Sequence, residues 1–158
     1  FKRENYPVRK MQTTQSPITF VNAEGLIVGR MCSKVAKRLL NGEEVIILNA
    51  EKAVFSGKKK SKVLEAHKFL EVGAPMRGPF HYRRPDRFLR KTVRGMVPFK
   101  LPKGKSAYKR LKVFMGVPLE FKDQKMITFE EANSINLKGP HFTLGELATE
   151  IGWFNRME

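Results

Sequence analysis

Residues 18–48 read ITFVNAEGLIVGRMCSKVAKRLLNGEEVIIL, and this stretch gives the strongest indication of the fold class. It opens with a short β-prone run, ITFV (18–21), and closes with VIIL (45–48), a continuous apolar run dominated by β-branched residues. Such a run is typical of a strand that is buried on both faces, and strands of that kind belong to parallel sheets covered by helices. We therefore expect a covered parallel sheet.

The segment between the two runs has helical spacing. Over 30–40, the apolar residues Met31, Val35 and Leu39 form one stripe, and the basic residues lie elsewhere around the axis. Asn41-Gly42 then provides a helix stop, because both residues tolerate the left-handed backbone conformation. Strand, helix and strand within about 30 residues predict a βαβ unit with a right-handed crossover.

Length and composition indicate one ordered domain with an unusual charge. The chain has 158 residues, and its hydrophobic fraction of 41% is that of ordinary globular proteins. However, 31 basic residues face 15 acidic ones, which gives a net charge of +16 and a pI of about 10.2. Such an excess indicates polyanionic partners, of which nucleic acids and acidic lipid headgroups are the usual ones.

The positive charge is concentrated in one part of the chain. Residues 58–112 hold 18 basic and three acidic residues, a net charge of +15, whereas all the others together carry +1. We call 58–112 the basic segment. A run of charged residues is usually a solvated face. Here, however, the positive charges would repel one another severely without a counter-charge, so we expect nucleic acid to bind the basic segment.

Cysteine usage and hydropathy indicate the redox compartment and argue against a membrane partner. The single cysteine, Cys32, excludes an intrachain disulfide and fits a reducing compartment. It falls in the expected helix, where we predict a packed side chain rather than a reactive thiol. No apolar run approaches the ~18 residues of a membrane span, and no signal-peptide pattern opens the chain, so no membrane partner is expected.

Within the basic segment, helices with two distinct faces are predicted. A first helix is expected around 61–70, after the run AVFSG (53–57). Pro85-Asp86 suits a helix start, and Gly95 and Pro98 suit its end. On that helix Leu89 and Val93, with Met96 as a third candidate, line one side, and the opposite side carries Arg87, Arg90, Lys91 and Arg94. The apolar side should dock on a core while the cations face outward.

Three further patterns complete the chain. LPKGKSAYKRLKVF (101–114) repeats the two-faced pattern: Ala107, Leu111 and Phe114 can pack, while Lys105, Lys109 and Lys112 recur on another face. KMITF (125–129) is a candidate strand. Thr143 and Glu146 form a capping box before a helix that Gly152 stops; its apolar stripe is Leu144, Leu147, Ala148 and Ile151.

Signatures of catalysis and nucleotide binding are weak. Gly25 and Gly29 do not form G-x-G-x-x-G, and the Gly57-Lys58 pair lacks the earlier glycine and the following Ser or Thr of a P-loop. The three histidines, His67, His81 and His141, lie far apart without metal-ligand spacing, and the acids form no catalytic pair. We therefore expect no catalytic residue, no metal, no cofactor and no small-molecule substrate.

Arginines beside aromatic residues favour RNA as the partner. Guanidinium groups contact phosphates in bidentate fashion, and Arg planes, Phe80 or Tyr82 can stack on exposed bases. His81 could hydrogen-bond a phosphate or a ribose, or it could have a local structural role. Three other aromatic residues are assigned to the core: Phe88, Phe99 and Phe114.

Four stretches resemble one known family. NAEGLIVGRMCSKVAKRLLNGEEVIILNAEKAVFSG (22–57), RGPFHYRRPDRFLRKTVRGMVP (77–98) and KGKSAYKRLKVFMGVP (103–118) resemble the universal large-subunit ribosomal protein family numbered thirteen. LKGPHFTLGELATEIGW (137–153) is similar to its eukaryotic and archaeal branch. The resemblance spans roughly 18–119, and the first 17 residues have no counterpart in it.

The resemblance implies an α/β fold and an RNA-bound role. The fold would be a three-layer α/β/α domain with a four-stranded parallel sheet, acting without catalysis as a structural component of the large ribosomal subunit. Partners would be large-subunit rRNA and neighbouring ribosomal proteins, in the cytoplasm, with nucleolar assembly in a eukaryote. It implies an RNA-facing role for Arg77, His81, Arg83, Arg84, Arg87, Arg94, Lys100, Lys103 and Lys105.

Charge adds further candidates to this RNA-binding set: Lys58, Lys59, Lys60, Arg90, Lys91, Lys109 and Lys112. The expected organisation is an N-terminal extension, 1–17, followed by a single rRNA-binding domain, 18–158, with basic extensions. Two other functions remain as alternatives. One is a nucleotide- or RNA-processing enzyme of α/β fold, and the other is a DNA-binding protein, which shares the electrostatics.

Overall fold

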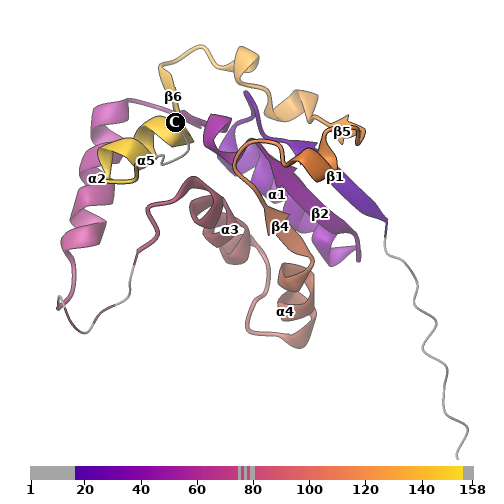
Figure 1. The fold of residues 1–158 in the computed structure, drawn as a ribbon. Helices are drawn as coiled ribbons and strands as arrows, with labels where there is room; N and C mark the ends of the chain where they lie inside the picture. Colours follow the sequence, from indigo (N-terminus) through magenta and orange to yellow (C-terminus); the bar gives the residue numbers. More distant parts are fainter. Residues whose placement is uncertain (1–16, 75, 77, 79–80, 155–158) are drawn as a thin grey trace, which may run out of the picture.

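The computed structural model describes residues 17–74, 76, 78 and 81–154 (Figure 1). The helices are α1 (Val28–Leu40), α2 (Lys59–Glu71), α3 (Pro85–Met96), α4 (Pro102–Lys109) and α5 (Leu144–Glu150). The strands are β1 (Ile18–Asn22), β2 (Glu44–Leu48), β3 (Val54–Ser56), β4 (Leu111–Val113), β5 (Met126–Ile127) and β6 (His141–Thr143).

A parallel sheet of four strands in the order β4-β2-β1-β5 forms the centre of the molecule. Strand β2 pairs with β1 and with β4, and its residues Val45 to Leu48 are all buried, as the apolar run predicted. A short antiparallel pair, β3 with β6, lies apart from this sheet.

Helices cover both sides of the sheet, which confirms the expected three-layer α/β architecture (Figure 1). Helix α1 packs on one face, and α3 and α4 pack against α1. On the other face Phe20 of β1 and Phe114 contact Phe121 of the 3-10 helix η2 (Leu119–Phe121), with ring centres 5.4 and 5.7 Å apart.

Helix α1 buries the predicted stripe. Met31, Val35 and Leu39 are fully buried, and so is Cys32 beside them. The last turn of α1 receives a hydrogen bond from Arg110, whose Nη2 donates to the carbonyl oxygen of Leu39 at 2.7 Å. A cation at this end also meets the negative end of the helix dipole.

Over 101–114 the predicted packing of Ala107 and Leu111 is confirmed, but the helical pattern does not continue into the second half. Helix α4 ends at Lys109, and the next residues form strand β4 instead of a further helical turn. Val45 donates its N–H to the carbonyl of Arg110 at 3.2 Å, and Phe114 donates to Ile47 at 2.8 Å. These hydrogen bonds join β4 to the edge of β2. The sequence of 101–114 could not predict them, because β2 lies far away in the chain.

The C-terminal helix begins at its predicted cap. Thr143 Oγ1 accepts a hydrogen bond from the Glu146 N–H and donates to Glu146 Oε1, both at 3.2 Å. The predicted stripe is buried: Leu144, Leu147, Ala148 and Ile151. Gly152 has φ +90°, which suits a glycine at a helix end. No helix in the described part of the chain is long and apolar enough to span a membrane.

Candidate nucleic-acid interface

Helix α3 carries the centre of the candidate interface. Pro85 opens it, and Asp86 in its first turn accepts two hydrogen bonds of 3.2 Å from the Arg84 guanidinium. Leu89 and Val93 are fully buried, as predicted. Met96, the third candidate for the packed side, is instead 41% exposed at the helix end.

The outward side of α3 holds the four predicted cations, and each lies over an aromatic ring. The distances from cation to ring centre are 4.1 Å for Arg94 over Phe99, 5.0 Å for Arg90 over Tyr108, 5.3 Å for Lys91 over Phe69 and 5.9 Å for Arg87 over Tyr82. Contact with a ring face orients a cation without using its N–H donors. Among the described residues, none of these four cations forms an ion pair with a carboxylate.

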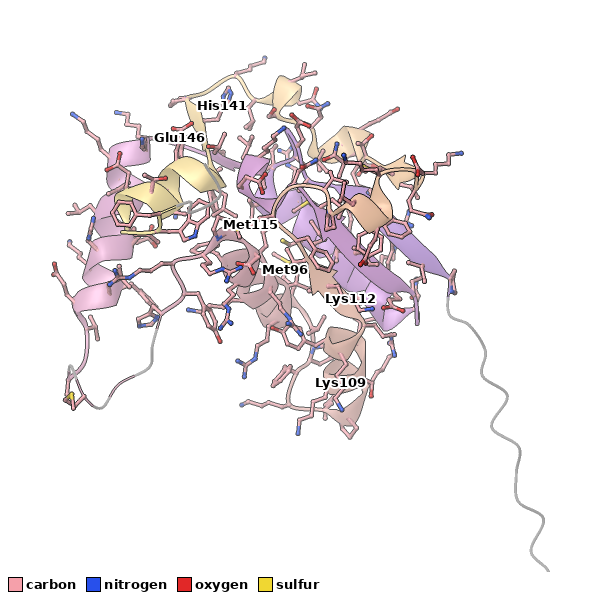
Figure 2. All side chains as sticks on the ribbon, in the orientation of Figure 1. Met96, Lys109, Lys112, Met115, His141 and Glu146 are labelled. Atoms are coloured by element: carbon pink, nitrogen blue, oxygen red, sulfur yellow. The ribbon has the colours of Figure 1, made fainter. Side chains whose placement is uncertain are left out.

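Helix α4 adds a second group of cations beside α3. Its first turn approaches the turn after α3 so closely that Gly104 is buried against Pro98. The exposed lysines on and before α4 are Lys100, Lys103, Lys105 and Lys109. Figure 2 shows Lys109 at the end of the molecule where α3 and α4 lie.

Two predicted lysines lie apart from this group and are already paired. Lys59 Nζ is 3.0 Å from Glu150 and 3.6 Å from Glu146, both on α5. Lys112 Nζ is 2.6 Å from Glu44. Because Leu111 and Val113 face the α1 side and strand residues alternate, Lys112 projects from the opposite face of the sheet.

The remaining candidates lie around the start of α2 and before α3. Lys58 and Lys60 are exposed at the start of α2, and Arg83 is exposed just before α3. Arg77, Phe80 and most of the expected N-terminal extension lie outside the described residues.

The histidines form no site together. His81 is half-buried, with its ring centre 4.5 Å from that of Phe69 in an edge-on arrangement. His67 and His141 are exposed on α2 and β6. In the described ranges no three His, Cys, Asp or Glu side chains gather as metal ligands would.

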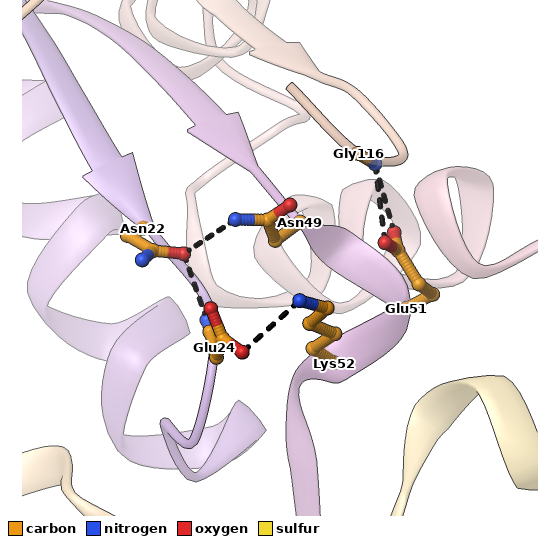
Figure 3. A network of polar contacts seen from close by, with 6 residues as sticks. All are labelled: Asn22, Glu24, Asn49, Glu51, Lys52 and Gly116. Atoms are coloured by element: carbon orange, nitrogen blue, oxygen red, sulfur yellow. Dashed lines mark hydrogen bonds and ion pairs between the residues drawn. The ribbon is translucent and has the colours of Figure 1, made fainter. Parts of the chain in front are cut away.

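The carboxyl ends of β1 and β2 are where a covered parallel sheet would bind a nucleotide. Figure 3 shows the polar side chains there engaged with one another. Asn49, at φ +56°, donates from Nδ2 to Asn22 Oδ1 at 2.9 Å. Lys52 pairs with Glu24 at 3.0 Å, while the Glu51 carboxylate accepts the Gly116 N–H at 3.1 and 3.2 Å. These side chains therefore bind one another and hold the loops together, and they form no phosphate-binding loop.

Sequence reasoning missed the aromatic platforms and one structural arginine. Tyr108 and Phe69 were not assigned. Phe99 packs against the core as predicted, but its second role, as the ring beneath Arg94, was not foreseen. The signal available was only the abundance of aromatic residues near arginines. Arg110 counted toward the charge of the basic segment, but it binds α1.

Comparison with known proteins gives one consistent result. A family model described as "Ribosomal protein L13" matches residues 17–120. The chain is 44% identical to the large ribosomal subunit protein uL13 of Methanococcoides burtonii over 136 residues, 85% of this chain and 98% of that protein. It is 40% identical to the uL13 of Archaeoglobus fulgidus over 148 residues (92% and 94%). Identity to the Saccharolobus solfataricus uL13 is 38% over 144 residues (88% and 95%).

Proposed function

Because the chain belongs to the ribosomal protein L13 family, we propose that it binds large-subunit rRNA through the outward cations of α3 and α4. As a member of this family it is a structural constituent of the large ribosomal subunit, acts in translation and is not an enzyme. Its partners are large-subunit rRNA and neighbouring ribosomal proteins, in ribosomes of the cytoplasm. Nucleolar assembly follows only for a eukaryotic host.

One observation carries the assignment to α3. Four exposed cations on one helix side are held over aromatic rings and face no described carboxylate, so their N–H donors remain for another acceptor. Phosphate oxygens are that acceptor in RNA. Contacts to the backbone and to RNA shape should dominate, because the A-form major groove hides base edges from side chains.

The proposed contact set keeps the sequence-based candidates and orders them by geometry. The first group is the α3 row, Arg87, Arg90, Lys91 and Arg94, with Lys100, Lys103, Lys105 and Lys109 beside it. The second group is Lys58, Lys60, His81 and Arg83, and Arg77 remains a candidate from the sequence alone. Lys59, Arg84 and Lys112 come last, since each would have to exchange a carboxylate for a phosphate.

We also propose that 18–158 acts as one rRNA-binding domain preceded by an extension, 1–17. The support comes from the C-terminal elements, which pack into the same core as α1. Phe142 of β6 and Leu144 and Leu147 of α5 belong to the buried cluster that holds Met31 and Val35. A core shared in this way is the property that defines one domain.

Salt titration of rRNA binding tests the interface. If about eight phosphates are contacted, affinity for an rRNA fragment should fall roughly 10³–10⁵-fold between about 50 and 200 mM salt. Arg87→Ala and Arg94→Ala should weaken binding and each lower the salt slope by about 1, with folding nearly intact.

Lys122→Ala is the matched control. Lys122 is exposed at the end of η2, on the other face of the sheet from α3, so its loss should leave binding unchanged. A flat salt dependence, or equal losses in the Lys122 and Arg94 variants, would refute the proposed interface.

A further inference from the structure

A groove of about 350 Å³ lies between α2 and α3, with α5 contributing to its lining. We call it the α2–α3 groove. Its lining is mostly apolar and includes Phe55, Phe69, Leu70, Phe88, Leu147 and Ile151. The volume falls in the range of small-ligand sites, about 300–1,000 Å³, and exceeds what a few waters need.

Helix α2 leaves the Phe69 side chain largely uncovered along this groove, while Val63 and Ala66 pack against the core. It has no buried residue, and Phe69, which lines the groove, is 56% exposed. A protein seldom leaves a contiguous apolar surface of this kind open to water without a partner. Tyr82, 42% exposed, adds a second aromatic ring to the lining.

The charges at the groove point to a polyanion rather than an apolar peptide. Lys62, Lys91 and His81 line it. Lys62 is paired with Glu65, the one acid in the lining, at 2.8 Å, whereas Lys91 forms no ion pair among the described residues. Lys91 also belongs to the outward cation row of α3. The groove is therefore continuous with the proposed rRNA interface.

We infer that the α2–α3 groove holds an unstacked nucleobase of the rRNA, with a flanking phosphate on Lys91 at its edge. This inference rests on the proposed rRNA-binding function and adds a base-binding site to it. A cation lies over one face of each of two rings in the lining, Lys91 over Phe69 and Arg87 over Tyr82, so the base would stack on the opposite face of a ring. Every base has a flat face that can stack in this way. Binding should therefore depend on a base being extruded more than on which base it is.

Two hairpin RNAs test this with the full chain. One carries a single bulged 2-aminopurine, and the other has the same 2-aminopurine in a base pair. The bulged RNA should bind about 5- to 150-fold more tightly, the worth of one base–aromatic stack, and its 2-aminopurine fluorescence should be quenched on binding. Phe69→Ala should abolish both the preference and the quenching. Because Phe69 also holds Lys91, this variant should weaken binding of the bulged and the paired hairpin alike until the two affinities are equal.

Leu64→Ala is the matched control for this variant. Leu64 lies on the same helix and is 58% exposed, close to the 56% of Phe69, but it does not line the groove. It should behave as the unsubstituted chain does. Equal binding of the two hairpins, or equal effects of the two variants, would overturn the base site. The rRNA interface would still stand if both hairpins bound in a salt-dependent way.

A crosslinking experiment in assembled large subunits separates RNA from protein as the occupant. With p-benzoylphenylalanine in place of Tyr82, irradiation should yield adducts on rRNA nucleotides. Adducts confined to a neighbouring protein, or the absence of any rRNA adduct, would overturn the inference.

Discussion

Gly104 shows how one residue without a side chain sets the approach of two elements. A Cβ built on Gly104 would lie 2.0 Å from the carbonyl oxygen of Pro98 and 3.0 Å from the N atom of Phe99. Both neighbours are backbone atoms, so they cannot move aside as a flexible side chain could. The distance between α4 and the turn after α3 therefore requires glycine.

Gly104→Ala should accordingly destabilise the protein by roughly 1–3 kcal/mol, as overpacking does in a core. Urea unfolding followed by circular dichroism measures this. Gly29→Ala is the control: Gly29 is exposed on α1 and its Cβ would meet nothing within 4 Å, so it should be neutral or stabilising by up to about 1 kcal/mol. Equal stability of the two variants would contradict the close approach.

Cys32 links burial to a dependence on pH. Burial raises the pKa of the Cys32 thiol from 9.0 to about 12, because the thiolate would lose its hydration. In the unfolded chain the thiol ionises from pH 9 upward, while the folded chain keeps its proton. The contribution of Cys32 to stability is thus complete below pH 9 and declines as pH rises from 9 toward 12.

Comparison with Cys32→Ala isolates this contribution from the titration of the lysines. The variant should be less stable at pH 8 because of the small cavity, and the difference should shrink by about 1 kcal/mol between about pH 8 and 10. Urea unfolding at the two pH values measures it. A difference that stays constant would show that the thiol ionises equally in the folded and unfolded chains.

Arg110 shows that a count of basic residues cannot tell which of them bind RNA and which bind within the fold. Nothing in the local sequence separates it from Lys109 or Lys112, yet it donates to the Leu39 carbonyl of α1, 71 positions earlier in the chain. The role of a cation depends on which acceptor the fold brings to it. For Arg110, this acceptor is not one of the residues near it in the sequence.

At the scale of elements, α3 is the helix whose two faces could be predicted. Its apolar residues recur at helical spacing and its cations lie on the other side. The orientation that buries the apolar residues therefore also exposes the cations. Leu89→Ala should cost roughly 2–5 kcal/mol of stability, because Leu89 is fully buried. Thermal or urea unfolding measures the loss.

Arg94→Ala provides the comparison on the same helix. Arg94 is exposed over Phe99, and its replacement should leave the free protein close to its original stability. If Arg94→Ala unfolded the protein and Leu89→Ala did not, the two faces of α3 would be assigned the wrong way round.

Helix α2 and strand β4 show what local patterns leave open. The helix was expected, but its spacing could not show that none of its residues would be buried. Strand β4 was absorbed into an apparent helix because Leu111 suits either structure, and pairing with β2 decided between them. In both elements a distant neighbour determined the outcome.

At the scale of the whole molecule, the charge is divided between a nearly neutral body and a basic segment. The cations of α3 and α4 share one end of the structure, whereas Lys59 and Lys112 are neutralised by carboxylates elsewhere. The positive electrostatic potential is therefore strongest around α3 and α4. This favours fast and salt-dependent association with a polyanion.

Competition between structured RNA and duplex DNA tests whether shape adds to this charge. The chain should prefer a large-subunit rRNA fragment over a DNA duplex of equal length at the same salt concentration, because RNA offers shape and extruded bases besides phosphate. Electrophoretic mobility shifts with each competitor measure the preference. Equal affinities would favour a purely electrostatic binder, the DNA-binding alternative.

The amino-acid sequence alone determined the βαβ unit, the buried run of β2, the two faces of α3 and the polyanionic partner. Each of these is a local property: periodicity and charge are set by neighbours along the chain. Tertiary structure alone decided the strand β4, the ion pairs of Lys59 and Lys112, the rings under Arg90 and Lys91 and the α2–α3 groove. These depend on groups far apart in sequence, whose energies exist only once the chain has folded and brought them together.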